Sequence, residues 1–306
     1  MTTDTLEHEI FPLTESDAAA LPALHEAFRR FWNGPLAASS PRVAYDAFFS
    51  ATLPRADVSF HPSTDAALPG WMCTPKDAIE DQAVLFLHGG AYVMGTAPAY
   101  RGFVSHVAAC TQRATLILEY PLAPEIALPG ALDLAVEAIE RLRQQFEKVA
   151  VVGDSAGGGL TLATLAETSN ASAAVVLSPW TDLTLSGSSV RDRASKDLLL
   201  TESALRDAAR GYVGRAAADD PRGSPLLAAS VSLPPLLIQV GSEEILYDDA
   251  LRYAQKAHAG GNQVTLQEWT GMHHVFQMNV DRLAAAQQSL HLVGRFLDRQ
   301  MGRSRK

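Results

Sequence analysis

Residues 153–157 read GDSAG, and no other stretch of the chain is as well suited to nucleophilic chemistry. The pattern is typical of a nucleophile elbow, a sharp turn between a strand and a helix that presents a serine hydroxyl. It follows the apolar run 149–152 and opens a predicted helix at about Ala156. Such a turn requires residues without side chains two positions away on either side, and Gly153 and Gly157 supply them. The motif therefore predicts Ser155 as a nucleophile.

A second interpretation of this segment is a glycine-rich turn that binds a phosphate through backbone N–H groups at a helix N-terminus. The residues match neither the P-loop pattern with its lysine nor the dinucleotide-binding fingerprint at its usual spacing. The nucleophile elbow is therefore the preferred interpretation.

A serine hydroxyl attacks a carbonyl only when a base takes its proton and donors stabilise the oxyanion that forms. The sequence HGGA at 88–91 ends the apolar run 83–87. We expect the N–H groups of Gly89 and Gly90 to point into a cleft beside Ser155, joined by the N–H of Ala156. A plain Gly-Gly turn is the alternative, and the presence of the elbow argues against it.

Three histidines follow the last predicted strand, 264–269, and are the candidates for the base: His273, His274 and His291. Around a serine of this kind the nucleophile, the acid and the base occur in that order along the chain. His291 falls within the long helical pattern that closes the chain. The loop pair His273 and His274 is therefore preferred.

The acid should follow the apolar run 236–240, where the loop GSEEILYDD at 241–249 offers four carboxylates. A buried carboxylate at this place would fix the imidazole tautomer and stabilise the imidazolium formed during attack. Asp248 and Asp249 resemble the acidic first turn of a following helix, which the helix dipole favours. Glu243 and Glu244 remain the alternatives on these grounds.

Short apolar runs alternate with helical patterns from about residue 57 onward. We expect strands at 57–61, 70–74, 83–87, 115–118, 149–152, 174–177, 236–240 and 264–269, and helices at 101–110, 132–146, 160–167 and 248–258. Several runs are apolar on both faces, as the strands of a buried parallel sheet must be. The pattern predicts an α/β fold with a mostly parallel central sheet flanked by helices, as a single domain over 1–306.

Two segments fall outside this alternation. An amphipathic helix is predicted at 14–33, and no strand is expected before it. Residues 183–221 are polar and rich in alanine, with a helix predicted at 202–211. An insertion of this size after a sheet strand often acts as a lid. We expect residues 1–55 and 183–221 to form a helical cap over a pocket.

Composition excludes several classes of function. The 306 residues are 47% hydrophobic and carry a net charge of −9, without a basic cluster beyond the short tail, so a nucleic-acid partner is not expected. The acidic N-terminus does not resemble a secretory signal, and no apolar run is long enough to span a membrane, so a cytoplasmic location is expected. Cys73 and Cys110 are too few for a disulfide framework or a zinc site.

Six motifs in matching order give residues 80–300 a clear resemblance to the bacterial hormone-sensitive-lipase family (family IV) of carboxylesterases, which has the α/β-hydrolase fold. These motifs are HGG at 88–90, YPLAPE at 120–125, GDSAGG at 153–158, SPW at 178–180, SPL at 224–226, and the acid and histidine loops. The resemblance implies Glu244 as the acid and His274 as the base. Three departures are that Glu244 stands where the family more often has Asp, Ala91 where it has a third glycine, and Pro121 where it has an arginine.

The family resemblance also implies a function. It predicts a carboxylesterase that hydrolyses small, short-acyl-chain esters through an acyl-enzyme, with no metal or organic cofactor and with pairing into a homodimer through an edge strand. Phe31, Trp32, Tyr92 and Trp180 are the candidate pocket walls, although each could equally belong to the core. Lactone hydrolysis by the same triad is the nearest alternative. A ligand receptor on this fold is the other, but such receptors have lost the histidine that this chain retains.

Overall fold

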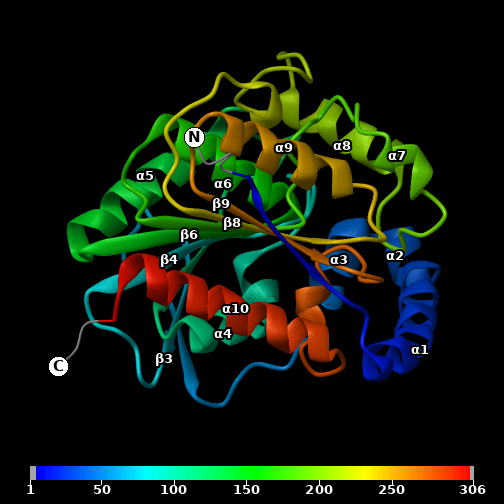
Figure 1. Cartoon of the computed structure of the whole chain (residues 1–306), viewed down its shortest axis with the longest axis horizontal. Helices are drawn as coiled ribbons and strands as arrows, with labels where there is room; N and C mark the ends of the chain where they lie inside the picture. The colour runs from blue at the N-terminus through cyan, green and yellow to red at the C-terminus, as the bar shows by residue number, and fades with distance from the viewer. Residues whose placement is uncertain (1–4, 304–306) are drawn as a thin grey trace.

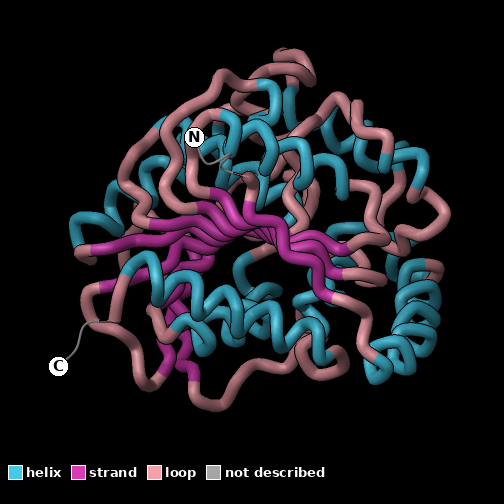
Figure 2. Tube along the Cα trace, in the orientation of Figure 1, coloured by secondary structure: helices cyan, strands magenta, loops and turns pink. Residues whose placement is uncertain are grey.

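The computed structural model describes residues 5–303, and in this part of the chain nine strands form one sheet (Figures 1 and 2). The strand order is β1-β9-β8-β7-β6-β4-β5-β3-β2, and neighbouring strands are parallel except for the pairs β2–β3 and β3–β5. The bounds are β1 Glu7–Phe11, β2 Val58–Pro62, β3 Gly70–Pro75, β4 Gln82–Leu87, β5 Ala114–Leu118, β6 Lys148–Asp154, β7 Ala173–Leu177, β8 Leu236–Gly241 and β9 Val264–Trp269. The predicted α/β fold is confirmed.

Helices cover both faces of this sheet (Figure 1). α4 (Ala97–Thr111) and α10 (Ala284–Met301) pack on one face, whereas α5 (Gly130–Gln145), α6 (Ser155–Glu167) and α9 (Tyr247–Ala259) cover the other. The remaining helices are α1 Glu15–Trp32, α2 Pro35–Ser39, α3 Pro41–Phe49, α7 Ser189–Asp192, α8 Glu202–Val213, and the 3₁₀ turns η1 Pro225–Leu227 and η2 Phe276–Asn279. No helix within residues 5–303 is long and apolar enough to cross a bilayer.

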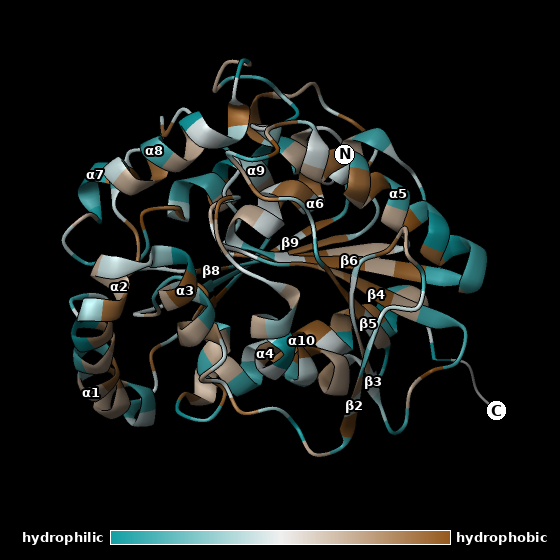
Figure 3. Ribbon diagram, turned by 180° about the vertical axis from the view of Figure 1, so that it is seen from behind, coloured by the Kyte–Doolittle hydropathy of each residue, from teal (hydrophilic) through white to brown (hydrophobic). Residues whose placement is uncertain are grey.

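The sheet separates two hydrophobic cores, one under each helical layer. Every residue of β4, β7 and β8 is buried, because successive side chains point to opposite faces and both faces are covered. In Figure 3 hydrophobic residues concentrate in β4, β6 and α6, whereas α5 carries hydrophilic stretches. This packing explains why the predicted strands were recognisable as unbroken apolar runs.

The expectation that no strand precedes the first helix is wrong. β1 pairs in parallel with β9 at the edge of the sheet, so residues 7–11 belong to the sheet rather than to a cap. Four of its five residues are exposed, and a strand of this kind has no apolar pattern to recognise. Its side chains are instead held by single contacts: Glu9 Oε2 accepts a hydrogen bond from Gln267 Nε2 at 2.6 Å, and Phe11 stacks on Trp269 at 4.2 Å.

Helix α1 is joined to α10 through one buried carboxylate. The Thr14 hydroxyl accepts the backbone N–H of Asp17 at 3.1 Å and so caps the start of α1. The Asp17 carboxylate accepts the N–H groups of Ala284 and Ala285 at 2.7 and 3.1 Å, which satisfies donors in the first turn of α10. Two distant helix starts are therefore fixed to each other.

Helix α3 is joined to the loop after β5 through Arg42. Its guanidinium makes two hydrogen bonds to Glu125, at 2.8 and 2.7 Å, and donates to the carbonyl oxygens of Val93 and Ala123, both at 2.8 Å. Glu125 ends the motif in which Pro121 replaces the arginine of the family pattern. The arginine partner of Glu125 therefore comes from α3.

Candidate active site

Ser155 lies at the turn from β6 into α6, with a backbone φ of +53°. A positive φ is strained for a residue that has a side chain. A Cβ added to Gly153 would lie 2.3 Å from the carbonyl oxygen of Gly157, and one added to Gly157 would lie 2.0 Å from that of Leu87. The predicted need for glycine on both sides of the serine is confirmed.

Ser155, His274 and Glu244 form one continuous chain of hydrogen bonds. Ser155 Oγ lies 2.9 Å from His274 Nε2, and His274 Nδ1 lies 2.7 Å from Glu244 Oε2. The three residues follow β6, β9 and β8, whose carboxyl ends lie at the same edge of the sheet. All three side chains are buried. This geometry places a serine hydroxyl, an imidazole and a carboxylate in the relation that nucleophilic catalysis requires.

The Glu244 carboxylate is held by two further donors. Its Oε1 accepts the backbone N–H of Gly241 at 2.6 Å and the hydroxyl of Ser178 at 2.8 Å, which leaves Oε2 for the imidazole. Ser178 Oγ in turn accepts the backbone N–H of Val275 at 3.1 Å. Ser178 thus joins the acid loop to the histidine loop. The sequence analysis used this serine only as part of a family motif, and its position directly after β7 was the available signal.

The other carboxylates of the acid loop face elsewhere. Glu243 forms an ion pair with Lys196 at 2.8 Å near the surface. Asp248 and Asp249 accept backbone N–H groups from the segment that follows β7 and so anchor it to α9. Of the four candidates, the structure brings Glu244 alone to the imidazole of His274.

The other candidate histidines do not reach Ser155. His273 is fully buried and points toward α1, where its ring lies edge-on to His25 and Phe28. Its Nε2 is 3.0 Å from Asn279 Nδ2, and burial lowers its pKa to about 3. His291 lies on the exposed surface of α10.

The protonation of His274 reflects two opposing influences. Burial, the largest single influence, disfavours the charged imidazolium and lowers the pKa, but the hydrogen bond that His274 donates to Glu244 and the negative charges of Glu244, Asp197 and Asp154 together outweigh it. The pKa of His274 therefore lies above its ordinary value. A raised pKa makes an imidazole a stronger proton acceptor than a free one.

The loop at 88–91 approaches Ser155 in a different way from the one expected. The N–H of Gly89 donates to Asp154 Oδ1 at 3.0 Å and to the hydroxyl oxygen of Tyr100 at 3.1 Å. It is therefore not free to bind an oxyanion, and the expectation for Gly89 is corrected. Gly90 and Ala91 line the cavity that contains Ser155, and within residues 5–303 their N–H groups have no hydrogen-bond partner.

Asp154 was not singled out in the sequence, although it directly precedes Ser155. Its carboxylate accepts hydrogen bonds from the N–H of Gly89 and, at 3.1 Å, from the hydroxyl of Tyr100. The Tyr45 hydroxyl lies 2.7 Å from that of Tyr100, so the chain of hydrogen bonds extends to α3. Burial raises the pKa of Asp154 to about 7, while the hydrogen bonds it accepts favour the charged form.

A cavity of about 310 Å³ opens onto Ser155 and His274. Most of its wall is apolar and comes from α1 to α3 on one side and the segment at 199–204 on the other. The lining side chains include Trp32, Ala37, Pro41, Tyr45, Phe48, Phe49, Met94, Leu199, Leu200, Ala204, Val275 and Met278. A cavity of this size suits a small organic molecule.

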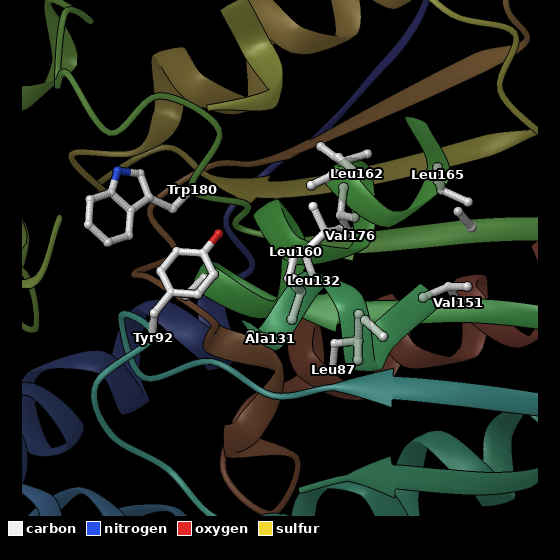
Figure 4. Packing of buried hydrophobic residues seen from close by; sticks show 14 of the residues in the cluster. Leu87, Tyr92, Ala131, Leu132, Val151, Leu160, Leu162, Leu165, Val176 and Trp180 are labelled. Atoms are coloured by element: carbon white, nitrogen blue, oxygen red, sulfur yellow. The ribbon is translucent and has the colours of Figure 1, made fainter. Parts of the chain in front are cut away.

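The predicted pocket walls divide into three groups. Trp32 lines the cavity at Ser155. Phe31 lines a neighbouring cavity, on the far side of Phe48. Tyr92 and Trp180 are buried in the core that also contains side chains of α5 and α6, and Figure 4 shows the Trp180 ring beside that of Tyr92. Neither residue lines the cavity at Ser155, so the assignment to the pocket is corrected in favour of the core alternative that the sequence left open. The Tyr92 ring stacks on Tyr212 at 3.7 Å.

Asp197 is a further carboxylate, half-buried, that the sequence did not reveal. It accepts the N–H groups of Leu199 and Leu200, both at 2.9 Å, and that of Ile245, also at 2.9 Å. Leu199 and Leu200 line the cavity, and Ile245 follows the acid Glu244. Asp197 therefore connects the cavity wall to the acid loop. A single polar residue in an irregular segment gives no periodicity that could have identified it.

Potential metal ligands are scattered in the described part of the chain. No group of three or more His, Cys, Asp or Glu side chains in it is arranged to hold a metal ion.

Known proteins resemble this chain in both sequence and fold. An acetyl-hydrolase of Streptomyces hygroscopicus is 35% identical over 268 residues, 84% of this chain and 88% of that protein. An esterase of Acinetobacter venetianus is 34% identical over 224 residues, 70% of this chain and 74% of that protein. The crystal structure of an esterase from the bacterial hormone-sensitive lipase family superposes with a TM-score of 0.89 at 31% identity, covering 95% of this chain and 100% of that one. The α/β-hydrolase fold family matches residues 84–278. The chain therefore belongs to the α/β-hydrolase fold family and, within it, to the bacterial hormone-sensitive-lipase family.

Proposed function

We propose that this protein is a carboxylesterase that hydrolyses small, short-chain esters with Ser155, His274 and Glu244. The observation that carries the proposal is the hydrogen-bonded chain of 2.9 and 2.7 Å from the serine hydroxyl to the buried carboxylate. Relatives that are called esterase and acetyl-hydrolase support ester hydrolysis as the reaction.

In the first step Ser155 Oγ attacks the ester carbonyl carbon while His274 Nε2 takes the hydroxyl proton. Glu244 holds the imidazole in the tautomer that has its proton on Nδ1, and it stabilises the imidazolium. The C–O bond to the alcohol then breaks, and the imidazolium returns its proton to the leaving oxygen. An acyl-enzyme on Ser155 remains.

In the second step a water molecule attacks the acyl-enzyme with His274 again as the base, and the carboxylic acid leaves as Ser155 regains its proton. In both steps a tetrahedral intermediate carries a negative oxygen. We assign the N–H groups of Gly90, Ala91 and Ala156 as its donors, because Gly90 and Ala91 line the cavity with free N–H groups and Ala156 follows the nucleophile.

The shape of the cavity supports a short substrate. Its walls are largely apolar, and aromatic side chains of α3, among them Phe48 and Phe49, close it on one side. We propose that α1–α3 and the segment 183–221 together act as the cap over the site. Small apolar esters fit such a space, and long acyl chains do not.

The test is hydrolysis of a p-nitrophenyl ester series from acetate to laurate by the wild-type protein and by Ser155→Ala. We expect activity that peaks at short acyl chains and falls by at least about 10³-fold in the variant. A serine-directed phosphonate should label Ser155 in the wild type with a stoichiometry of one. Full activity of Ser155→Ala would refute the proposal. It would also be refuted by a wild type that hydrolyses no ester of the series and is not labelled by the phosphonate.

A further inference from the structure

Two cavities lie on opposite sides of one wall made by Phe48 and Met278. The cavity at Ser155 has a volume of about 310 Å³. A second cavity of about 180 Å³ lies beyond it, lined by Phe28, Phe31, Ala51 and Thr52 among others. Phe48 and Met278 are the side chains that line both. Because they border both spaces, we call Phe48 and Met278 the wall between the cavity at Ser155 and the second cavity.

The wall is built from two segments that are far apart in the sequence. Phe48 lies on α3 and Met278 on η2, four residues after His274. The Thr52 hydroxyl donates to the carbonyl oxygen of Met278 at 3.0 Å and so ties the end of α3 to the histidine loop. The Phe48 ring packs against Phe28 and Trp32, with centroids 4.9 and 5.3 Å apart. These contacts hold the wall in place.

The second cavity combines an apolar, aromatic part with a polar part. Phe28, Phe31 and Ala51 supply apolar surface, while Asn279, Asp281 and Arg282 provide polar groups among its lining residues. A hydrocarbon chain that entered it would contact aromatic rings. In the wild-type structure such a chain, starting at Ser155, would meet Phe48 and Met278 first.

We infer that Phe48 and Met278 set the length limit of the substrate, and that the second cavity is a closed-off subsite for a longer hydrocarbon arm of an ester. This inference rests on the proposed esterase function and explains the preference for short substrates. Removing either side chain joins the two spaces. Each additional methylene that becomes buried should then raise kcat/KM by about 4-fold until the joined space is filled.

The experiment uses two ester series with the wild type, Phe48→Ala and Met278→Ala. One series lengthens the acyl chain of p-nitrophenyl esters, and the other lengthens the alcohol of acetate esters. We expect the length at which kcat/KM peaks to increase by at least about two methylenes in one of the series in both variants. The series that responds identifies the arm of the ester that runs toward the second cavity.

Leu199→Ala is the matched control, because it also removes a large apolar side chain from the wall of the first cavity. Leu199 is not part of the lining of the second cavity, so its truncation should leave the length limit as in the wild type. Phe48 belongs to an aromatic cluster and its loss could unfold the protein, so rates are expressed per active site titrated with a small phosphonate. Met278→Ala, which removes no ring, provides the second test.

The outcomes separate this inference from the proposed function. A wild type that hydrolyses short esters, with variants that keep its length limit in both series, overturns the inference and leaves the esterase intact. The same holds if Leu199→Ala extends the limit as much as the wall variants do. A wild type that neither hydrolyses any ester nor reacts with the phosphonate refutes the proposed function itself.

Discussion

The carboxylate of Asp154 accepts the backbone N–H of Gly89 at 3.0 Å, so the residue before the nucleophile holds the loop that faces it. The same carboxylate accepts the hydroxyl of Tyr100, which itself accepts the N–H of Gly89. These three groups form a closed triangle of hydrogen bonds behind the turn. The N–H of Gly89 is thereby occupied, whereas Gly90 and Ala91 line the cavity and their N–H groups have no hydrogen-bond partner within residues 5–303.

Asp154→Asn tests this positioning role. The amide has one acceptor oxygen where the carboxylate has two, so it cannot accept both the N–H of Gly89 and the hydroxyl of Tyr100 in their present positions, and the loop should shift. Displaced oxyanion donors lower kcat, and we expect a loss of about 10- to 100-fold with little change in KM. Steady-state kinetics on a short p-nitrophenyl ester measures it.

Tyr100→Phe is the control for Asp154→Asn, because it leaves the bond between Asp154 and Gly89 in place. We expect it to lose less activity than Asp154→Asn does. If Asp154→Asn raised KM and left kcat unchanged, Asp154 would not be the residue that positions the loop.

Glu244→Gln should change both the rate and its pH dependence. Only neutral His274 can act as the base, and its raised pKa places the acid limb of kcat/KM above pH 6.5 in the wild type. Loss of the carboxylate charge lowers that pKa, so the limb should move to lower pH. Rates on a short ester between pH 5 and pH 9 measure both effects.

The size of the loss in Glu244→Gln follows from the donors around the carboxylate. Gly241 and Ser178 both donate to Oε1, so the amide oxygen should take that position and turn the NH₂ toward His274 Nδ1. The imidazole proton would then sit on Nε2, facing Ser155, and kcat should fall by about 10⁴-fold. Glu244→Asp keeps the charge and should lose less. An acid limb that stays in place in Glu244→Gln would contradict the role of this carboxylate.

The buried His273 should make the protein less stable in acid. Burial lowers its pKa to about 3, whereas the ordinary value in the unfolded chain is about 6.5. Below pH 6.5 the unfolded state therefore binds a proton that the folded state does not, and stability falls as the pH falls. The expected contribution is about 1.4 kcal/mol per pH unit between these two pKa values.

His273→Gln removes this contribution and keeps an acceptor for the Asn279 amide. Between pH 6.5 and 5 we expect the wild type to lose about 2 kcal/mol more of its free energy of unfolding than the variant loses. Urea unfolding at the two pH values measures the difference. His88, whose pKa burial lowers to about 4, contributes equally to both proteins. Equal losses in the two would show that His273 is not held neutral by the fold.

The sequence by itself determined those features of the protein that depend on residues close together in the chain. Apolar runs that must be buried on both faces predicted β4, β7 and β8, and the glycines around Ser155 predicted the strained turn. The family motifs pointed to Glu244 and His274, which the structure brings to Ser155. The edge strand β1 was not predicted, because exposed residues that pair through the backbone leave no hydrophobic pattern.

Only the tertiary structure decided which groups meet at the site. Gly89 and Gly90 are equivalent in the sequence, but the carboxylate of Asp154 engages the N–H of Gly89 and leaves that of Gly90 free. Tyr92 and Trp180 are large aromatic residues near catalytic motifs, yet their rings lie in the core. Directions of N–H groups and of rings depend on contacts between segments far apart in the chain, and composition and spacing carry no information about those contacts.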